Sequence, residues 1–152
     1  MKLRKILFSN FVLLLFLMGC TDKEVIYDTF EDALTSGLSS YSLTKNDVAY
    51  VEESENDSLI IYHPSYGAFG FAIIEKSSKD KGYSWVKPRH DIGFEMDKSS
   101  SAIVEVKGTN NDYRIAVGTL PNESSAVKIT GVKNVNDINT SRGLFFYILD
   151  EK

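Results

Sequence analysis

From residue 47 almost to its C-terminus, the chain consists of short runs rich in β-branched and aromatic residues, separated by polar turns. Runs of this kind are typical of β-strands. Four of them follow one another in the first half, at residues 47–52, 58–63, 69–76 and 83–87. The polar run 53–57 fits a hairpin connection between the first two, and 64–67 and 77–82 fit turns. This half therefore predicts a four-stranded antiparallel meander.

The second half continues in the same style. Residue character alternates over 102–107 and, after a turn at 110–112, over 113–118, as expected for half-buried strands. Val127 and Ile129 mark a further strand, and a long polar loop around 134–141 follows it. The last run, 143–149, is apolar on both faces, which predicts a position in the centre of a sheet rather than at its edge.

One helix is expected before the strands. Asp28 and Thr29 are both good N-caps, and Thr29 followed by Asp32 resembles a capping box. The apolar residues of the following segment fall on one helical face, namely Phe30, Ala33, Leu34 and Leu38. Gly37 offers a C-terminal stop. The expected fold is α+β and mostly β, with one N-terminal helix packed on antiparallel sheets in a sandwich-like or meander arrangement.

The N-terminus has the layout of a secretory signal peptide. A basic start precedes an apolar run from Ile6 to Met18, which is shorter than the roughly 20 apolar residues of a spanning helix. Leu17-Met18-Gly19-Cys20 resembles the bacterial lipobox, although Met18 is a less usual occupant of its position. The resemblance implies cleavage between Gly19 and Cys20, and a thioether-linked diacylglyceryl group on Cys20.

These features divide the chain into three parts: a lipoprotein signal peptide (1–19), a lipidated Cys20 with a short tether (20–27), and a single β-rich extracytoplasmic domain (28–152). Acyl chains on Cys20 would attach the domain to the outer face of the cell membrane, or to the outer membrane in a Gram-negative host. Because Cys20 is the only cysteine, an internal disulfide is impossible.

The charge of the chain limits its partners. The whole chain carries −4, and the signal segment holds three positive and no negative residues, so the mature part carries −7. An acidic domain is a poor candidate for nucleic acid, whose binding needs a basic patch. We therefore expect no nucleic-acid partner.

The order of elements and two sequence blocks indicate a resemblance. A capped helix, a strand, an acidic turn and a second strand precede the blocks Gly-Phe-Ala-Ile-Ile-Glu-Lys-Ser (70–77) and Gly-Tyr-Ser-Trp-Val-Lys (82–87). This arrangement is similar to small uncharacterised lipoproteins of low-GC Gram-positive bacteria. The resemblance covers Asp28 to about Lys87 and the second half only loosely. It implies a location, and it implies no activity.

Candidate chemistry is sparse. His63 and His90 could join acidic residues at a metal, but the spacing typical of metal ligands is missing, and both are better explained as strand-end or loop residues. The densest group of recognition-type side chains is Trp85, Arg89, His90 and Asp91. Asp91 could orient His90, and Arg89 could bind an anion with two hydrogen bonds. The favoured alternative places Trp85 in the core and the other three in a loop.

The sequence therefore predicts no catalytic residue set, no metal and no cofactor. The expected function is a non-enzymatic module that binds a protein partner or an envelope component while lipid on Cys20 holds it at the membrane. A small-molecule or peptide-binding lipoprotein is the alternative, with an aromatic cleft between the sheets. Tyr62, Tyr66, Phe69 and Phe71 could line such a ligand face, although core packing is their more common use. A hydrolase whose residues meet only in space is the weakest possibility.

Overall fold

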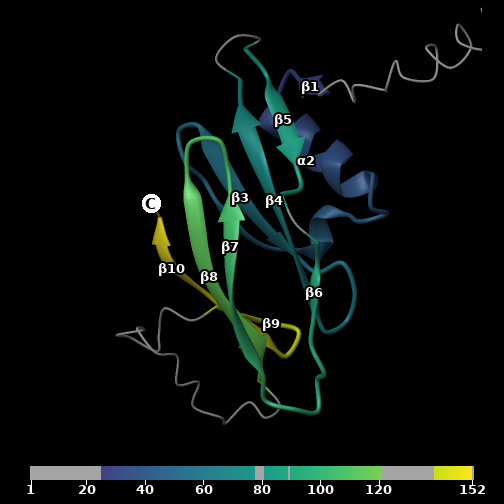
Figure 1. The fold of residues 1–152 in the computed structure, drawn as a ribbon. Coiled ribbons are helices and arrows are strands. Elements are labelled where there is room, and N and C mark those ends of the chain that lie inside the picture. The colour runs from purple at the N-terminus through teal and green to yellow at the C-terminus, as the bar shows by residue number, and fades with distance from the viewer. Residues whose placement is uncertain (1–24, 78–80, 89, 121–138, 152) are drawn as a thin grey trace, which may run out of the picture.

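The computed structural model describes residues 25–77, 81–88, 90–120 and 139–151. Within these residues, one α-helix packs on the first of two antiparallel sheets (Figure 1). The elements in chain order are β1 (Ile26–Tyr27), α2 (Phe30–Ser39), a 3-10 turn (Lys45–Asp47), β2 (Val48–Glu52), β3 (Asp57–Tyr62), β4 (Ala68–Lys76), β5 (Tyr83–Val86), β6 (Ile92–Gly93), β7 (Ser101–Lys107), β8 (Asp112–Thr119), β9 (Asn139–Ser141) and β10 (Leu144–Glu151). The expected fold, mostly β with one helix on antiparallel sheets, is confirmed.

The N-terminal expectations fall largely outside this part of the chain. The signal segment 1–19 and the lipid attachment at Cys20 lie outside the described residues. Within the segment expected to be a tether, 20–27, Ile26 and Tyr27 form β1 and pair with Ser84 and Tyr83 of β5.

The first sheet has the strand order β1-β5-β4-β3-β2, and the short β6 pairs with the start of β4. Neighbours from β2 to β5 are antiparallel, so the predicted meander is confirmed with strand ends shifted by one or two residues. The acidic connection between β2 and β3 is the hairpin that the sequence indicated.

The second sheet has the order β7-β8-β10-β9. The doubly apolar β10 lies between β8 and β9, which confirms its predicted central place. The expected polar loop around 134–141 was wrong at its end, because Asn139–Ser141 form β9 and pair with β10. Arg142 and Gly143 both have positive φ, 51° and 75°, as a tight two-residue hairpin turn requires. The predicted strand at Val127 and Ile129 lies outside the described residues.

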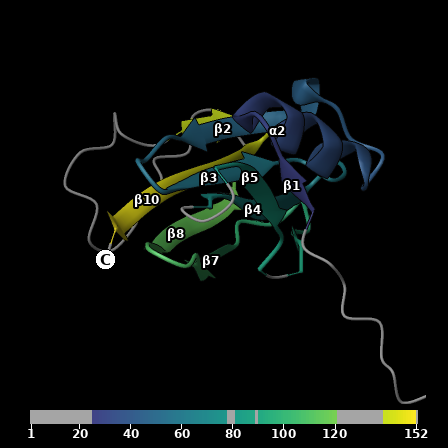
Figure 2. The same cartoon turned by 90° about the horizontal axis from the view of Figure 1, so that it is seen from above.

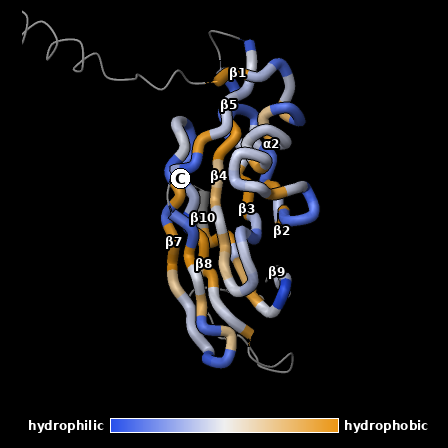
Figure 3. The backbone as a smooth tube through the Cα atoms, turned by 90° about the vertical axis from the view of Figure 1, so that its right-hand side faces the viewer, coloured by the Kyte–Doolittle hydropathy of each residue, from blue (hydrophilic) through white to orange (hydrophobic). Residues whose placement is uncertain are grey.

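The domain has three layers, with the first sheet between α2 and the second sheet (Figure 2). Twelve buried side chains fill the space between the sheets: Leu59, Ile61, Phe69, Phe71 and Ile73 from the first, and Val104, Val106, Tyr113, Ile115, Val117, Leu144 and Phe146 from the second. Hydrophobic stretches run along β7 and β8, while the turns at both ends are hydrophilic (Figure 3). Because β3 and β4 form the middle layer, both of their faces are apolar, as in a fully buried strand.

Helix α2 begins as predicted, with the Thr29 hydroxyl accepting a hydrogen bond from the Asp32 backbone N–H at 3.1 Å. Its apolar face packs on Ile60, Tyr62, Ala72 and Ile74 of the first sheet. The prediction that Gly37 ends the helix was wrong, because α2 continues to Ser39. Gly37 is instead the place where the Trp85 ring lies against the helix backbone, and a β-carbon there would overlap the ring.

Polar contacts join the two sheets near opposite ends of β3. At one end, the buried Asp57 carboxylate accepts hydrogen bonds from the backbone N–H groups of Asn110 and Asn111, at 2.6 and 3.1 Å, and from the Asn110 amide at 2.7 Å. At the other end, Arg142 in the β9–β10 turn contacts the Asp47 carboxylate at 3.2 Å. These contacts fix how the sheets sit on each other.

Candidate recognition site around Lys87

The three described members of the predicted cluster, Trp85, His90 and Asp91, have different surroundings. Trp85 packs between α2 and the first sheet, as the favoured alternative expected, and its ring centroid lies 6.1 Å from that of Tyr62. Asp91 binds Lys87 and Tyr62, so the idea that it orients His90 was wrong. His90 is exposed, and Arg89 lies outside the described residues.

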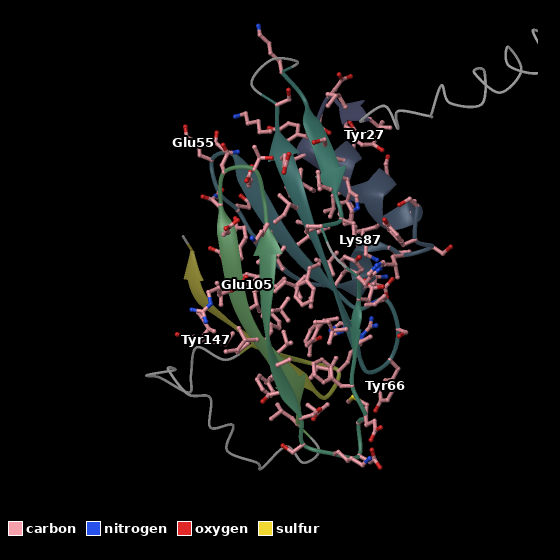
Figure 4. The ribbon with its side chains drawn as sticks, in the orientation of Figure 1. Tyr27, Glu55, Tyr66, Lys87, Glu105 and Tyr147 are labelled. Atoms are coloured by element: carbon pink, nitrogen blue, oxygen red, sulfur yellow. The ribbon has the colours of Figure 1, made fainter. Side chains whose placement is uncertain are left out.

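Lys87 takes the central place in this region and projects on the α2 side of the domain (Figure 4). Its Nζ lies 2.8 Å from Asp91 Oδ1 and 4.3 Å from the centroid of the Tyr41 ring, and the side chain is only 17% exposed. Burial disfavours the ammonium, but hydrogen bonds to Asp91 and Tyr62, and the charges of both, outweigh it and raise the pKa of Lys87. Lys87 therefore carries a stable positive charge balanced by Asp91.

The buried Tyr62 side chain lies next to this ion pair. Its hydroxyl lies 3.5 Å from Asp91 Oδ1, and the Lys87 Nζ lies 5.9 Å from its ring centroid. Burial, assisted by the Asp91 charge, raises the pKa of the Tyr62 phenol to about 12. The phenol stays protonated at physiological pH and acts as a hydrogen-bond donor.

Local sequence explains how these side chains meet. Gly70 lies directly under the Tyr62 ring, where a β-carbon would overlap it, so glycine lets the ring lie flat on β4. Tyr41 follows the end of α2, and the next residue, Ser42, turns the chain with a φ of 59°. Lys87 continues the β5 face that carries Trp85, a pattern visible in the sequence, whereas nothing in the local sequence linked Tyr41 or Tyr62 to Lys87.

An open hollow of about 660 Å³ lies here, lined by Tyr41, Lys87, Pro88 and His90. It offers a partly exposed aromatic ring, a charge-balanced ammonium, a rigid proline and a free imidazole edge. Lys87 is engaged with Tyr41 and Asp91, and no described group of the hollow is paired as nucleophile and base. This arrangement suits recognition better than proton transfer.

His63 has a different environment from His90. It is 2% exposed and stacks on Phe69 with ring centroids 5.0 Å apart, and its Nδ1 lies 3.1 Å from the Ala68 carbonyl oxygen. Burial lowers the pKa of the His63 imidazole. No group of three or more His, Cys, Asp or Glu side chains suited to holding a metal occurs among the described residues.

The four aromatic residues considered for a ligand face do not share one. Phe69 and Phe71 are buried between the sheets, Tyr62 lies on the opposite face of the first sheet beneath α2, and Tyr66 is 78% exposed. Tyr66 is also well separated from Lys87 (Figure 4).

In the described part of the chain, no helix combines the length and the apolar character needed to span a membrane. Comparison with known proteins found no matching family model and no similar curated protein or solved structure.

Proposed function

We propose that the protein is a lipid-anchored module on the outer face of the cell membrane, where it binds a protein partner or another envelope component without catalysing a reaction. The lipobox-like sequence ending at Cys20 supports the anchor. The observation that carries the recognition part is the pairing of Lys87 with Asp91 and Tyr41 in the open hollow.

The pairing of Lys87 favours recognition for an energetic reason. Side chains that are already ordered lose little conformational entropy when a partner docks on them. Aromatic groups such as the exposed Tyr41 ring are enriched in the centres of protein interfaces. Because Asp91 balances the Lys87 charge, this surface selects a partner by shape and hydrogen bonding more than by net charge.

The anchor would supply location. Each buried acyl CH₂ group contributes about 0.8 kcal/mol, and stable attachment needs two chains, which a diacylglyceryl group provides. The mature charge of −7 would keep the domain off an anionic bilayer and leave its surfaces accessible. The similarity to small lipoproteins of low-GC Gram-positive bacteria supports the same location and stays a prediction.

Replacing the lipidated residue tests the anchor. With Cys20→Ser we expect the protein to leave the membrane fraction or to stay uncleaved, because serine cannot form the thioether. Fractionation and the mass of the N-terminal peptide measure both results. A Cys20→Ser chain that remains membrane-bound with the same mature N-terminal peptide would contradict lipidation.

Photo-cross-linking on intact cells tests recognition. A photoreactive residue placed at position 90 should give one discrete adduct, and the same group placed at position 66 should not. Adding Tyr41→Ala should abolish the adduct, because it removes the exposed ring from the hollow. Equal labelling from both positions, or an adduct that survives Tyr41→Ala, would show that the hollow does not select the partner.

A further inference from the structure

A second hollow, of about 300 Å³, lies on the helix-facing side of the first sheet, beyond the start of α2. Strand residues of that face and the first helical residue form its apolar part, namely Ile74, Tyr83 and Phe30. The rings of Phe30 and Tyr83 meet edge to face with centroids 6.2 Å apart. The rim is the β2–β3 hairpin, residues 53–56, whose labelled Glu55 lies far from Lys87 (Figure 4). This hollow is distinct from the site around Lys87.

The polar group in its floor is Ser58. This residue is only 7% exposed, and strand alternation puts its side chain on the same face of β3 as Ile60 and Tyr62. Its hydroxyl makes no hydrogen bond within the described residues, although it lines the hollow. The hydroxyl oxygen is not one of the fully buried unpaired atoms of the described residues, so it is open to the hollow and available to a ligand.

Three charged side chains of opposite sign line the same hollow without pairing. Glu53 and Glu55 come from the hairpin, and Lys76 comes from the end of β4. No ion pair of these three occurs in the described part of the chain, whereas Lys45, Lys87, Lys98 and Arg142 each contact a carboxylate. Separated charges around an apolar floor can each take the opposite charge of one small ligand.

The rim is held in place before any ligand binds. The Asn56 carbonyl accepts a hydrogen bond from the Lys76 backbone N–H at 2.7 Å, and the Ser54 hydroxyl contacts the Asp57 carbonyl. The Asn111 amide also donates to the Ser54 hydroxyl, at 3.0 Å. A fixed rim lowers the entropic cost of binding.

We propose that this hollow binds a free α-amino acid with an apolar side chain. Glu53 and Glu55 receive the ammonium group, while Lys76 and the Ser58 hydroxyl receive the carboxylate. The side chain packs on Phe30, Ile74 and Tyr83. The volume is at the low end of known ligand sites, which fits a ligand of this size. The proposal goes beyond partner binding and does not depend on it.

Equilibrium dialysis of the full chain in detergent tests this with radiolabelled L-leucine. Isoamylamine lacks the carboxylate of leucine and 4-methylpentanoate lacks its ammonium, so both should compete at least about tenfold more weakly. If either analogue competes as well as leucine does, the hollow does not recognise both charges of the amino acid. If the hollow binds a neutral sugar in place of leucine, or retains no leucine at millimolar concentration, it is not an amino-acid site.

Variants locate the binding. Ser58→Ala and Lys76→Gln should each lower the affinity for leucine about tenfold or more. Lys76→Gln should leave the affinity for isoamylamine unchanged, because the amine has no carboxylate to contact Lys76. Tyr41→Ala, in the other hollow, should leave leucine binding unchanged. Leucine binding that is lost with Tyr41→Ala but kept in Ser58→Ala and Lys76→Gln would place the ligand at Lys87 and contradict this assignment.

Discussion

Gly37 has a role at the level of a single atom. It lies within a helix, where replacing glycine by alanine ordinarily stabilises a protein by about 1 kcal/mol. Here the added methyl group would overlap the Trp85 ring. We expect Gly37→Ala to lower the free energy of unfolding by about 1–3 kcal/mol, since overpacking costs more than the helix gains. Urea unfolding followed by Trp85 fluorescence measures this change.

A control at an uncrowded glycine shows the effect of a glycine-to-alanine change without a steric overlap. Gly93 is exposed, and a β-carbon there meets nothing within 4 Å. Gly93→Ala should therefore change stability by less than about 0.5 kcal/mol. A Gly37→Ala protein that is more stable than the wild type would mean that Trp85 does not lie against the helix.

The residues of the Lys87 site show what sequence can supply at this scale. Trp85 and Asp91 could be singled out because they are recognition-type side chains that lie close together in the sequence. The alternation of residues on β5 also placed Trp85 in the core. Tyr41 and Tyr62 could not be chosen in the same way. Tyr62 reaches Lys87 because β4 pairs with both β3 and β5, and Tyr41 reaches it because α2 packs against β5. Such contacts between distant segments leave no local pattern.

A polar contact between a turn of the second sheet and a strand of the first helps to hold the two sheets together. The turn between β7 and β8 donates three hydrogen bonds to the fully buried Asp57 carboxylate at the start of β3. We expect Asp57→Asn to lower the free energy of unfolding by about 1–3 kcal/mol, because an amide presents a donor to groups that are themselves donors. Thermal and urea unfolding give the size of the loss.

Asp112 provides the comparison for this tie. It is an exposed carboxylate in the same turn region, so Asp112→Asn should leave stability nearly unchanged. If Asp57→Asn proves as harmless as Asp112→Asn, the turn does not fasten the sheets through this carboxylate.

At the element scale, sequence patterns predicted the elements that form by burying apolar residues. They failed for elements that depend on turn geometry or on a close packing contact. The strands of the meander and the central β10 bury apolar residues, so their composition identifies them. Strand β9 is polar (Asn-Thr-Ser), and it forms because the Arg142–Gly143 turn reverses the chain so that β10 pairs with it. The end of α2 was misplaced because Gly37 serves packing and not the helix terminus.

At the scale of the whole molecule, His63 directly follows β3 and links the 3-10 turn to the core between the sheets. Its backbone N–H donates to the Asp47 carbonyl at 2.8 Å, and its ring stacks on Phe69. Burial lowers the pKa of the His63 imidazole more than the hydrogen bond to the Ala68 backbone raises it, while the charge of Arg142 lowers it and that of Asp47 raises it by smaller amounts. The folded protein therefore resists protonation of His63 more than the unfolded chain does.

This difference makes stability depend on pH in a defined window. Above the ordinary histidine pKa of 6.5, His63 is neutral in both states and contributes no pH dependence. Below 6.5 the unfolded chain takes up a proton that the folded protein refuses, so the free energy of unfolding falls as pH falls. The lowered pKa of the Asp47 carboxyl acts separately, because its stabilisation is lost only below about 3.8.

Unfolding by urea at pH 7.5, 6.5 and 5.5 checks this window. We expect wild-type stability to drop between 6.5 and 5.5. His63→Asn should weaken that drop even though it costs stability at every pH, since an amide can still donate to the Ala68 carbonyl but does not titrate. The exposed His90, replaced in the same way, should leave the drop intact. Parallel declines in the wild type and His63→Asn would assign the acid sensitivity of the fold to groups other than this histidine.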